Sequence, residues 1–126
     1  MNYVLAIVLC AAMLTVSFGE MHSPFLGLYS DPNHPDCYRK IIETKMTDKL
    51  SVYGQDNING EGVSCKTDDK SQLDVWGPCP ALINNITQII VDLSGKGGPS
   101  DLTGVWDSGT NRIVWADGNY WQQTQP

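Results

Sequence analysis

Short runs of strand-forming residues, separated by glycine, proline, asparagine and aspartate, extend from about residue 25 to the end of this 126-residue chain. Such runs are typical of an all-β domain, and only residues 80–86 could hold a turn of helix. Leu50-Ser51-Val52 and Leu73-Asp74-Val75 alternate apolar and polar residues, which predicts strands with one buried face. The predicted strands span residues 25–29, 38–43, 49–54, 62–66, 72–77, 87–93, 102–107, 112–116 and 119–122.

Brief connections between these strands favour a single antiparallel meander. Asp117-Gly118 is the strongest hairpin signal, because both residue types accept a positive φ. A break is expected at residues 31–35, whose two prolines lack the N–H that a strand ladder needs. A meander tends to close or curl so that its edges are hidden. We therefore predict an all-β fold in which a small antiparallel meander closes into an up-and-down barrel or packs as a compact sandwich.

Two pairs of predicted strands share a pattern. Residues 49–54 resemble residues 72–77, and residues 25–29 resemble residues 102–106. In the second pair a glycine, Gly27 or Gly104, stands two residues before an aromatic residue. Such a glycine relieves crowding where a sheet bends or another strand crosses closely. Internal duplication and chance similarity both remain open as the origin of the pattern.

The first 19 residues are expected to be removed from the mature protein. Residues 1–19 carry no charged side chain, and their apolar run over residues 3–16 is shorter than the roughly 20 residues of a membrane span. Ser17 and Gly19 are small residues at the positions that a secretory signal peptide needs before its cleavage site. The alternative is an N-terminal membrane anchor, and no later stretch is apolar enough to cross a bilayer. We predict a signal peptide, a single β-rich domain over residues 20–126, and a secreted, extracellular protein.

Cysteine number predicts one disulfide bond. Cys10 lies in the predicted signal peptide, which leaves Cys37, Cys65 and Cys79 in an oxidising compartment. Any of the three pairings leaves one thiol, which is either buried or joined to a second chain in a disulfide-linked dimer. In a flat meander Cys37 and Cys79 lie too far apart to bond, so that pairing would itself indicate closure of the sheet.

Charge and histidine content exclude several classes of function. The chain has 14 acidic and 8 basic residues and a formal net charge of −6. Nucleic-acid binding depends on neutralising phosphates with lysine and arginine, and anionic membranes repel an acidic protein, so neither is an expected partner. Catalysis has little support, because only His22 and His34 are available and no nucleophile motif accompanies them. We predict a non-enzymatic protein without a cofactor.

Two segments contain residue types that bind metals, and both are interpreted as turns. Asp31, His34, Asp36 and Cys37 cluster within seven residues, but a structural zinc site needs a second pair of ligands elsewhere. A proline-rich loop with local turn hydrogen bonds explains this cluster better. Residues 55–61 place side-chain oxygens before a glycine, but a calcium loop needs Asp at its first position and Glu where this chain has Lys66, so an Asn-Gly turn is expected. We predict no metal site.

Aromatic residues concentrate near the C-terminus beside aspartate and asparagine. Indole rings pack on the C–H faces of sugars while neighbouring polar groups bind the hydroxyls, so this composition is typical of glycan recognition. The alternative is that most of these rings form the core of a small β domain. Adjacent Tyr120 and Trp121 face opposite sides of a strand, so one of them is expected outside. The candidate ligand-binding residues are Trp106, Trp115, Asp117, Asn119, Tyr120 and Trp121.

The leading hypothesis is a secreted recognition protein that binds an extracellular glycan. One alternative is an acidic structural component of an extracellular or mineralised matrix that associates weakly with calcium. The other is a carrier of a small apolar ligand inside a β-barrel. Asn85-Ile86-Thr87 is a sequon for N-glycosylation, so Asn85 is a predicted modification site.

Overall fold

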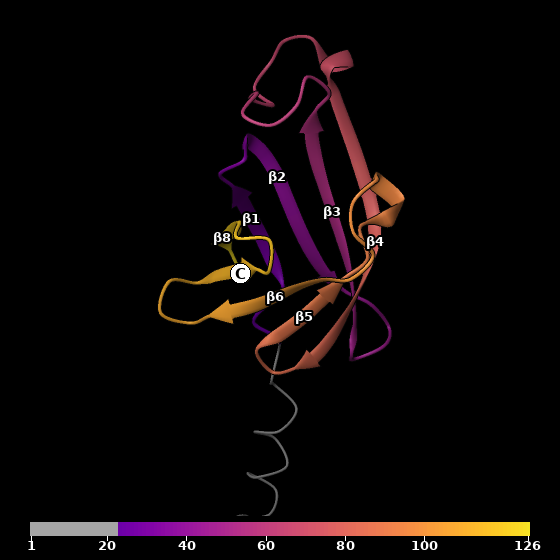
Figure 1. Ribbon diagram of the computed structural model, residues 1–126, viewed down its shortest axis with the longest axis vertical. Coiled ribbons are helices and arrows are strands. Elements are labelled where there is room, and N and C mark those ends of the chain that lie inside the picture. Colours follow the sequence, from indigo (N-terminus) through magenta and orange to yellow (C-terminus); the bar gives the residue numbers. More distant parts are fainter. Residues whose placement is uncertain (1–22) are drawn as a thin grey trace, which may run out of the picture.

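The computed structural model describes residues 23–126, so the predicted signal peptide, Cys10 and His22 lie outside the described residues. Over these described residues the chain forms eight strands and two 3-10 turns (Figure 1). In order they are β1 (Gly27–Asp31), β2 (His34–Glu43), β3 (Lys49–Asn57), η1 (Lys70–Gln72), β4 (Leu73–Asn85), β5 (Gln88–Val91), η2 (Ser94–Lys96), β6 (Leu102–Asp107), β7 (Arg112–Trp115) and β8 (Tyr120–Gln125).

The strands form a closed barrel in chain order, and each strand is antiparallel to both neighbours. Closure joins β1 to β8, with Leu28 opposite Gln125 and Tyr29 opposite Gln123. Closure removes the free edges that an open sheet would expose. The predicted all-β antiparallel meander is confirmed, and of the two architectures the chain adopts the up-and-down barrel.

Alternation along the strands fills the interior with side chains. Leu50 and Val52 of β3 and Ile89 and Val91 of β5 point inward, as their spacing predicts. An eight-stranded barrel is just wide enough for side chains to fill it or for one small ligand to enter. The buried cluster consists of Phe25, Tyr29, Ile41, Leu50, Val52, Trp76, Cys79, Ala81, Ile89, Val91, Leu93, Ile113, Trp115 and Trp121.

The two ends of the barrel differ, because an up-and-down order places alternate connections at opposite ends. The β1–β2, β3–β4, β5–β6 and β7–β8 connections share one end, which we call the mouth. Strands β2, β3 and β4 have 10, 9 and 13 residues, whereas β5 to β8 have four to six. In Figure 1 the long strands rise above the short ones, so one wall of the barrel stands higher than the other at the mouth.

Several local predictions were wrong. Residues 62–66 form no strand, because Gly62 has a φ of +81° and its N–H bonds the carbonyl of Asn33 instead of a ladder. Residues 80–85 lie in the one segment that could have held a helical turn, and they continue β4, with Ala81 facing the core opposite Leu50.

The break expected at residues 31–35 is shorter in the structure. It is a two-residue turn between β1 and β2, and Asp31 pairs with His34. In β4 the predicted inward face is also wrong, because Val75 is 63 % exposed and Trp76 points inward. A register shift between Val52 and Gly54 on the neighbouring strand accompanies this change.

The disulfide joins Cys37 of β2 to Cys65 of the β3–β4 connection. It ties that connection to the barrel wall, and the N–H of Cys65 also bonds the carbonyl of Pro35 at 3.0 Å. Cys79, among the described cysteines, is free and buried in β4. The barrel therefore closes without a Cys37–Cys79 bond, and the disulfide-linked dimer stays a prediction.

Candidate functional site

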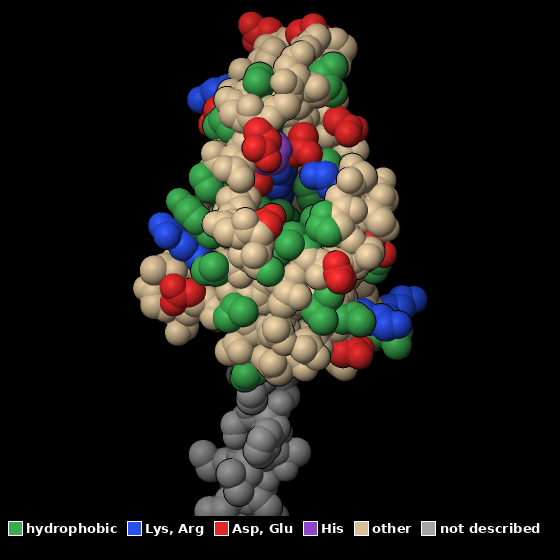
Figure 2. Space-filling view, viewed as in Figure 1, with side chains coloured by type: hydrophobic (Ala, Val, Ile, Leu, Met, Phe, Trp, Pro, Cys, Tyr) green, Lys and Arg blue, Asp and Glu red, His purple; other side chains and the backbone are tan. Residues whose placement is uncertain are grey.

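A recess of about 120 Å³ opens at the mouth of the barrel, and we call it the mouth recess. In Figure 2 acidic, basic and histidine side chains gather there beside hydrophobic ones, around a hollow in the face. The strand ends and all four mouth connections contribute to its lining. The lining residues are Asp31, Asn33, His34, Arg39, Glu61, Trp76, Leu93, Lys96, Leu102, Trp115, Asp117, Asn119 and Trp121.

Two glycines make room for the tryptophan rings that line this recess. Gly54 pairs with Trp76 across β3 and β4, and Gly104 pairs with Trp115 across β6 and β7. A Cβ atom on Gly104 would lie 2.7 Å from the Trp115 ring, and one on Gly54 would overlap the Trp76 ring. Trp115 in turn packs edge-on against Trp121, with ring centroids 4.8 Å apart. Each indole therefore lies inside the barrel because its cross-strand partner has no side chain.

Arg39 is the centre of a buried network at the base of the recess. Its side chain is 1 % exposed, and β2 places it on the same inward face as Cys37 and Ile41. Its Nη1 donates to the carbonyls of Tyr38 at 3.1 Å and Gln55 at 2.7 Å. Its Nη2 donates to Asp31 at 2.9 Å and to Asp56 at 2.8 Å. These four bonds use the N–H groups of both terminal nitrogens.

Arg39 also lies between aromatic rings. Its guanidinium carbon is 5.2 Å from the Trp76 ring centroid and 5.5 Å from that of Trp121. Both distances are within the range of cation–π attraction. The buried charge is thus stabilised by two carboxylates and two indoles together.

Asp31 is held ionised by several donors. Burial alone would raise the pKa of Asp31, but the Asn119 amide, the Arg39 charge, the Asn33 N–H and His34 together hold it below its ordinary range. The Asn119 Nδ2 and Asn33 N–H donate at 3.0 and 2.9 Å, and His34 Nδ1 lies 3.0 Å from the carboxylate. Asp31 therefore links the β7–β8 connection to the β1–β2 turn.

Asp56 is the second carboxylate of the network. Burial alone would raise the pKa of Asp56. The hydrogen bond from Lys96 and the charges of Arg39, Lys96 and His34 outweigh this effect, so the pKa lies below its ordinary value. Lys96 Nζ donates to Asp56 at 2.9 Å, and Trp76 Nε1 donates to it at 3.1 Å. Lys96 also lies 4.2 Å from the Trp76 ring centroid. The β5–β6 connection is thereby fixed against the high wall of the mouth.

Two donors at this site have no partner within residues 23–126. They are Arg39 Nε and Trp115 Nε1, and both are buried. Buried polar groups in folded proteins are nearly always hydrogen-bonded, so each such group calls for an explanation. Both residues line the mouth recess, so a bound molecule with acceptor oxygens could supply these partners once neighbouring side chains move to uncover the two nitrogens.

The structure brings four of the six predicted ligand-binding residues to this recess: Trp115, Asp117, Asn119 and Trp121. Tyr120 lies next to it, on the other face of β8, and the Arg112 guanidinium is 4.2 Å from its ring centroid. Trp106 is elsewhere, packed edge-on against Phe25 with centroids 6.2 Å apart.

Sequence reasoning missed the charged part of the site. The sequence indicates only a local turn for Asp31 and His34, gives no signal for Lys96, and does not single out Trp76 among the four tryptophans. One signal could have found Arg39, because it falls on the inward face of a strand whose alternate residues are apolar.

Other predicted sites lie apart from the recess. Asn85 is exposed at the turn between β4 and β5, opposite the mouth, and its Oδ1 accepts from the Thr87 N–H at 2.9 Å. No cluster of three or more histidine, cysteine or acidic residues suited to a metal ion occurs in the described part of the chain. Over the same residues, no helix is long and apolar enough to cross a membrane.

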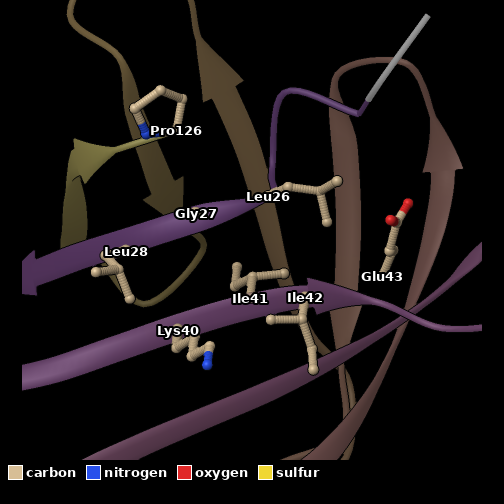
Figure 3. A pocket seen from close by; sticks show the side chains of 8 residues that line it. All are labelled: Leu26, Gly27, Leu28, Lys40, Ile41, Ile42, Glu43 and Pro126. Atoms are coloured by element: carbon tan, nitrogen blue, oxygen red, sulfur yellow. The ribbon is translucent and has the colours of Figure 1, made fainter. Parts of the chain in front are cut away.

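An apolar depression of about 420 Å³ lies on the outer surface of β1 and β2, at the end opposite the mouth. Figure 3 shows Leu26, Leu28 and Ile42 around it together with Pro126. It has no aromatic lining and none of the charged network, so it lacks the features that make the mouth recess a candidate site.

Comparison of the chain with protein-family models, with curated proteins and with solved structures finds no match. The candidate function therefore rests on the geometry and chemistry of the mouth recess.

Proposed function

We propose that this protein is a non-enzymatic recognition protein that binds a saccharide in the mouth recess. The observation that carries the proposal is the pair of buried donors without partners, Arg39 Nε and Trp115 Nε1, beside three indole rings. A sugar ring offers acceptor oxygens to such donors and C–H faces to indoles. Small-ligand sites combine apolar and aromatic walls with a few fixed polar groups in this way.

The charge of the recess favours a neutral ligand. Arg39 and Lys96 are already paired with Asp31 and Asp56, so the two cations are balanced by two carboxylates. Glu61 adds a further negative charge near the entrance. An anionic ligand would meet this excess of carboxylates without a free cation, whereas a neutral polyhydroxylated ring needs none.

The size of the recess favours one sugar ring over an extended apolar ligand. Its volume of about 120 Å³ is well below the roughly 300–1,000 Å³ of pockets that enclose drug-sized molecules. Buried side chains such as Ile41, Val52 and Ile113 occupy the barrel interior beneath it. This arrangement argues against the alternative of an apolar carrier.

We further propose that the protein works outside the cell as a glycoprotein modified at Asn85. The Cys37–Cys65 disulfide supports this location, because disulfides persist in oxidising compartments. Asn85 is exposed at a turn, where a glycan would project away from the mouth.

A glycan-array screen of the folded protein, followed by titration with tryptophan fluorescence as the readout, tests the proposed function. The matched variants are Trp115→Phe, which removes a donor at the recess, and Trp106→Phe, which changes an indole outside it. We expect a saturable saccharide whose affinity falls about tenfold in Trp115→Phe, the equivalent of about one hydrogen bond, and stays unchanged in Trp106→Phe.

Absence of any saturable saccharide would contradict the proposal, as would equal loss of affinity in the two variants. Weak, salt-sensitive uptake of many calcium ions in place of sugar binding would instead favour the acidic matrix protein.

A further inference from the structure

A second depression adjoins the mouth recess, and we call it the outer groove. Its volume is about 610 Å³, and its lining includes Pro32, Asn33, Glu61, Asp117, Asn119 and Tyr120. Asn33, Glu61, Asp117 and Asn119 also line the mouth recess. The two spaces therefore share a rim, and a molecule seated in the recess can continue into the groove over these side chains.

The recess and the groove differ in size, and this difference limits how a ligand can occupy them. The recess, at about 120 Å³, has room for no more than one sugar ring, while the groove is about five times larger in volume and more open to solvent. A chain of sugars cannot pass through the recess, because packed side chains close the barrel beneath it. One end of such a chain can enter the recess, and the rest must leave by the rim.

The shared rim carries the polar groups that bind hydroxyls. Glu61 and Asp117 offer carboxylate oxygens, and Asn33 and Asn119 offer amide groups. Tyr120, which lines the groove but not the recess, adds an aromatic ring, and the guanidinium of Arg112, 4.2 Å from its centroid, helps to fix that ring. The groove thus repeats, in a shallower form, the combination of aromatic and polar groups found in the recess.

The rim is held in place before any ligand binds. Asn119 is fixed by its bond to Asp31 at 3.0 Å and by the bond from its N–H to Asp117, also at 3.0 Å. Glu61 lies in the β3–β4 connection, which the Gly62 N–H ties to the Asn33 carbonyl at 2.9 Å. A preformed surface loses little conformational entropy on binding, so contacts made there add to affinity.

From this continuity we propose that the protein recognises the end of an oligosaccharide chain, with the terminal ring in the mouth recess and the next ring in the outer groove. The inference rests on the proposed function, because it assumes that a saccharide enters the recess. It adds that the ligand is at least a disaccharide unit and that Tyr120 contributes only to the second ring.

Calorimetric titration with matched sugars tests this inference. The probes are the methyl glycosides of glucose, galactose, mannose and N-acetylglucosamine, with disaccharides and trisaccharides that carry each of them at the chain end. We expect a disaccharide to bind at least tenfold more tightly than the methyl glycoside of its terminal sugar, and the third unit to add less than twofold.

Variants separate the two spaces. Tyr120→Ala should reduce the affinity for the disaccharide toward that of the methyl glycoside, and should leave the methyl glycoside within twofold of its original affinity. Trp115→Phe should weaken both probes by the same factor. Tyr53→Ala changes a half-buried tyrosine of β3 that lines neither space, so it is the matched control and should change neither affinity.

Equal affinity for the methyl glycoside and the disaccharide would overturn the chain-end inference while leaving saccharide binding in the recess intact. Equal weakening of both probes by Tyr120→Ala would overturn it as well. Failure of every probe to bind the folded protein would overturn the proposed function itself, and the inference with it.

Discussion

Gly104→Ala tests whether the Trp115 indole lies inside the barrel because Gly104, its cross-strand partner, has no side chain. Gly104 lies opposite Trp115 across β6 and β7. A Cβ atom there would lie 2.6 Å from Cγ2 of Ile113 and 2.7 Å from the Trp115 ring, whereas ordinary contacts are 3.4–4 Å. The indole would have to move by roughly 0.7 Å, and Trp121 packs directly against it.

The expected cost follows from this overlap. Adding a methyl group to a well-packed core typically costs about 1–3 kcal/mol, because neighbouring side chains leave their preferred positions. For a domain of this size, 1 kcal/mol corresponds to about 4–8 °C in Tm. We therefore expect Gly104→Ala to lower Tm by roughly 5–20 °C, and to weaken saccharide binding because Trp115 lines the recess.

Gly95→Ala is the matched control, since a Cβ at Gly95 meets nothing within 4 Å. Urea unfolding followed by tryptophan fluorescence gives the free energy of unfolding of both variants. A difference of less than about 0.5 kcal/mol between them would show that Gly104 is not needed to place the indole, because surface substitutions commonly fall within that range.

The network, the disulfide and the free thiol give three further predictions. The folded-state pKa values of Asp31 and Asp56 are lowered, so the two carboxylates stabilise the fold at neutral pH and lose this effect as the pH falls below about 4. Urea unfolding at a series of pH values should show this loss of stability, and the loss should be smaller in Asp31→Asn. Replacing Cys37 and Cys65 by serine should cost about 3–4 kcal/mol in the same assay, since the bond closes a loop with a sequence separation of 28, and no loss would contradict the pairing. Burial raises the pKa of the Cys79 thiol, so iodoacetamide should modify it only in denaturant; rapid labelling of the native protein would contradict its placement in the core.

The sequence was sufficient for the fold class because turn residues and alternation act locally. Residues 102–107 form β6 with the predicted bounds, and the alternate residues of β5 point inward as expected. Register was harder to predict, because it depends on partners far away in the chain. Two residue steps of β3, from Val52 to Gly54, match three of β4, from Cys79 to Trp76, and this bulge reverses the face that Leu73 and Val75 were expected to bury. The local signal for it is Gly77-Pro78, where Gly77 has a φ of +106°.

Only the part of the candidate site near the C-terminus could be predicted from the sequence. Trp115, Asp117, Asn119 and Trp121 are close in sequence, so local composition identified them. Arg39 and Lys96 are 57 residues apart, and only barrel closure brings them to the same recess. Composition also could not separate Trp106, which packs on Phe25, from the tryptophans that line the site.

In the proposed function, Arg39 Nε and Trp115 Nε1 donate to oxygens of a saccharide in the mouth recess. Both N–H groups give assignable signals in ¹H–¹⁵N spectra of the labelled protein, so a titration with the tightest-binding disaccharide of the series tests the claim directly. We predict that both signals shift in a saturable manner and that their exchange with solvent slows. Saturable binding that leaves both signals in place would contradict the proposed role of these two donors and locate the saccharide elsewhere on the barrel.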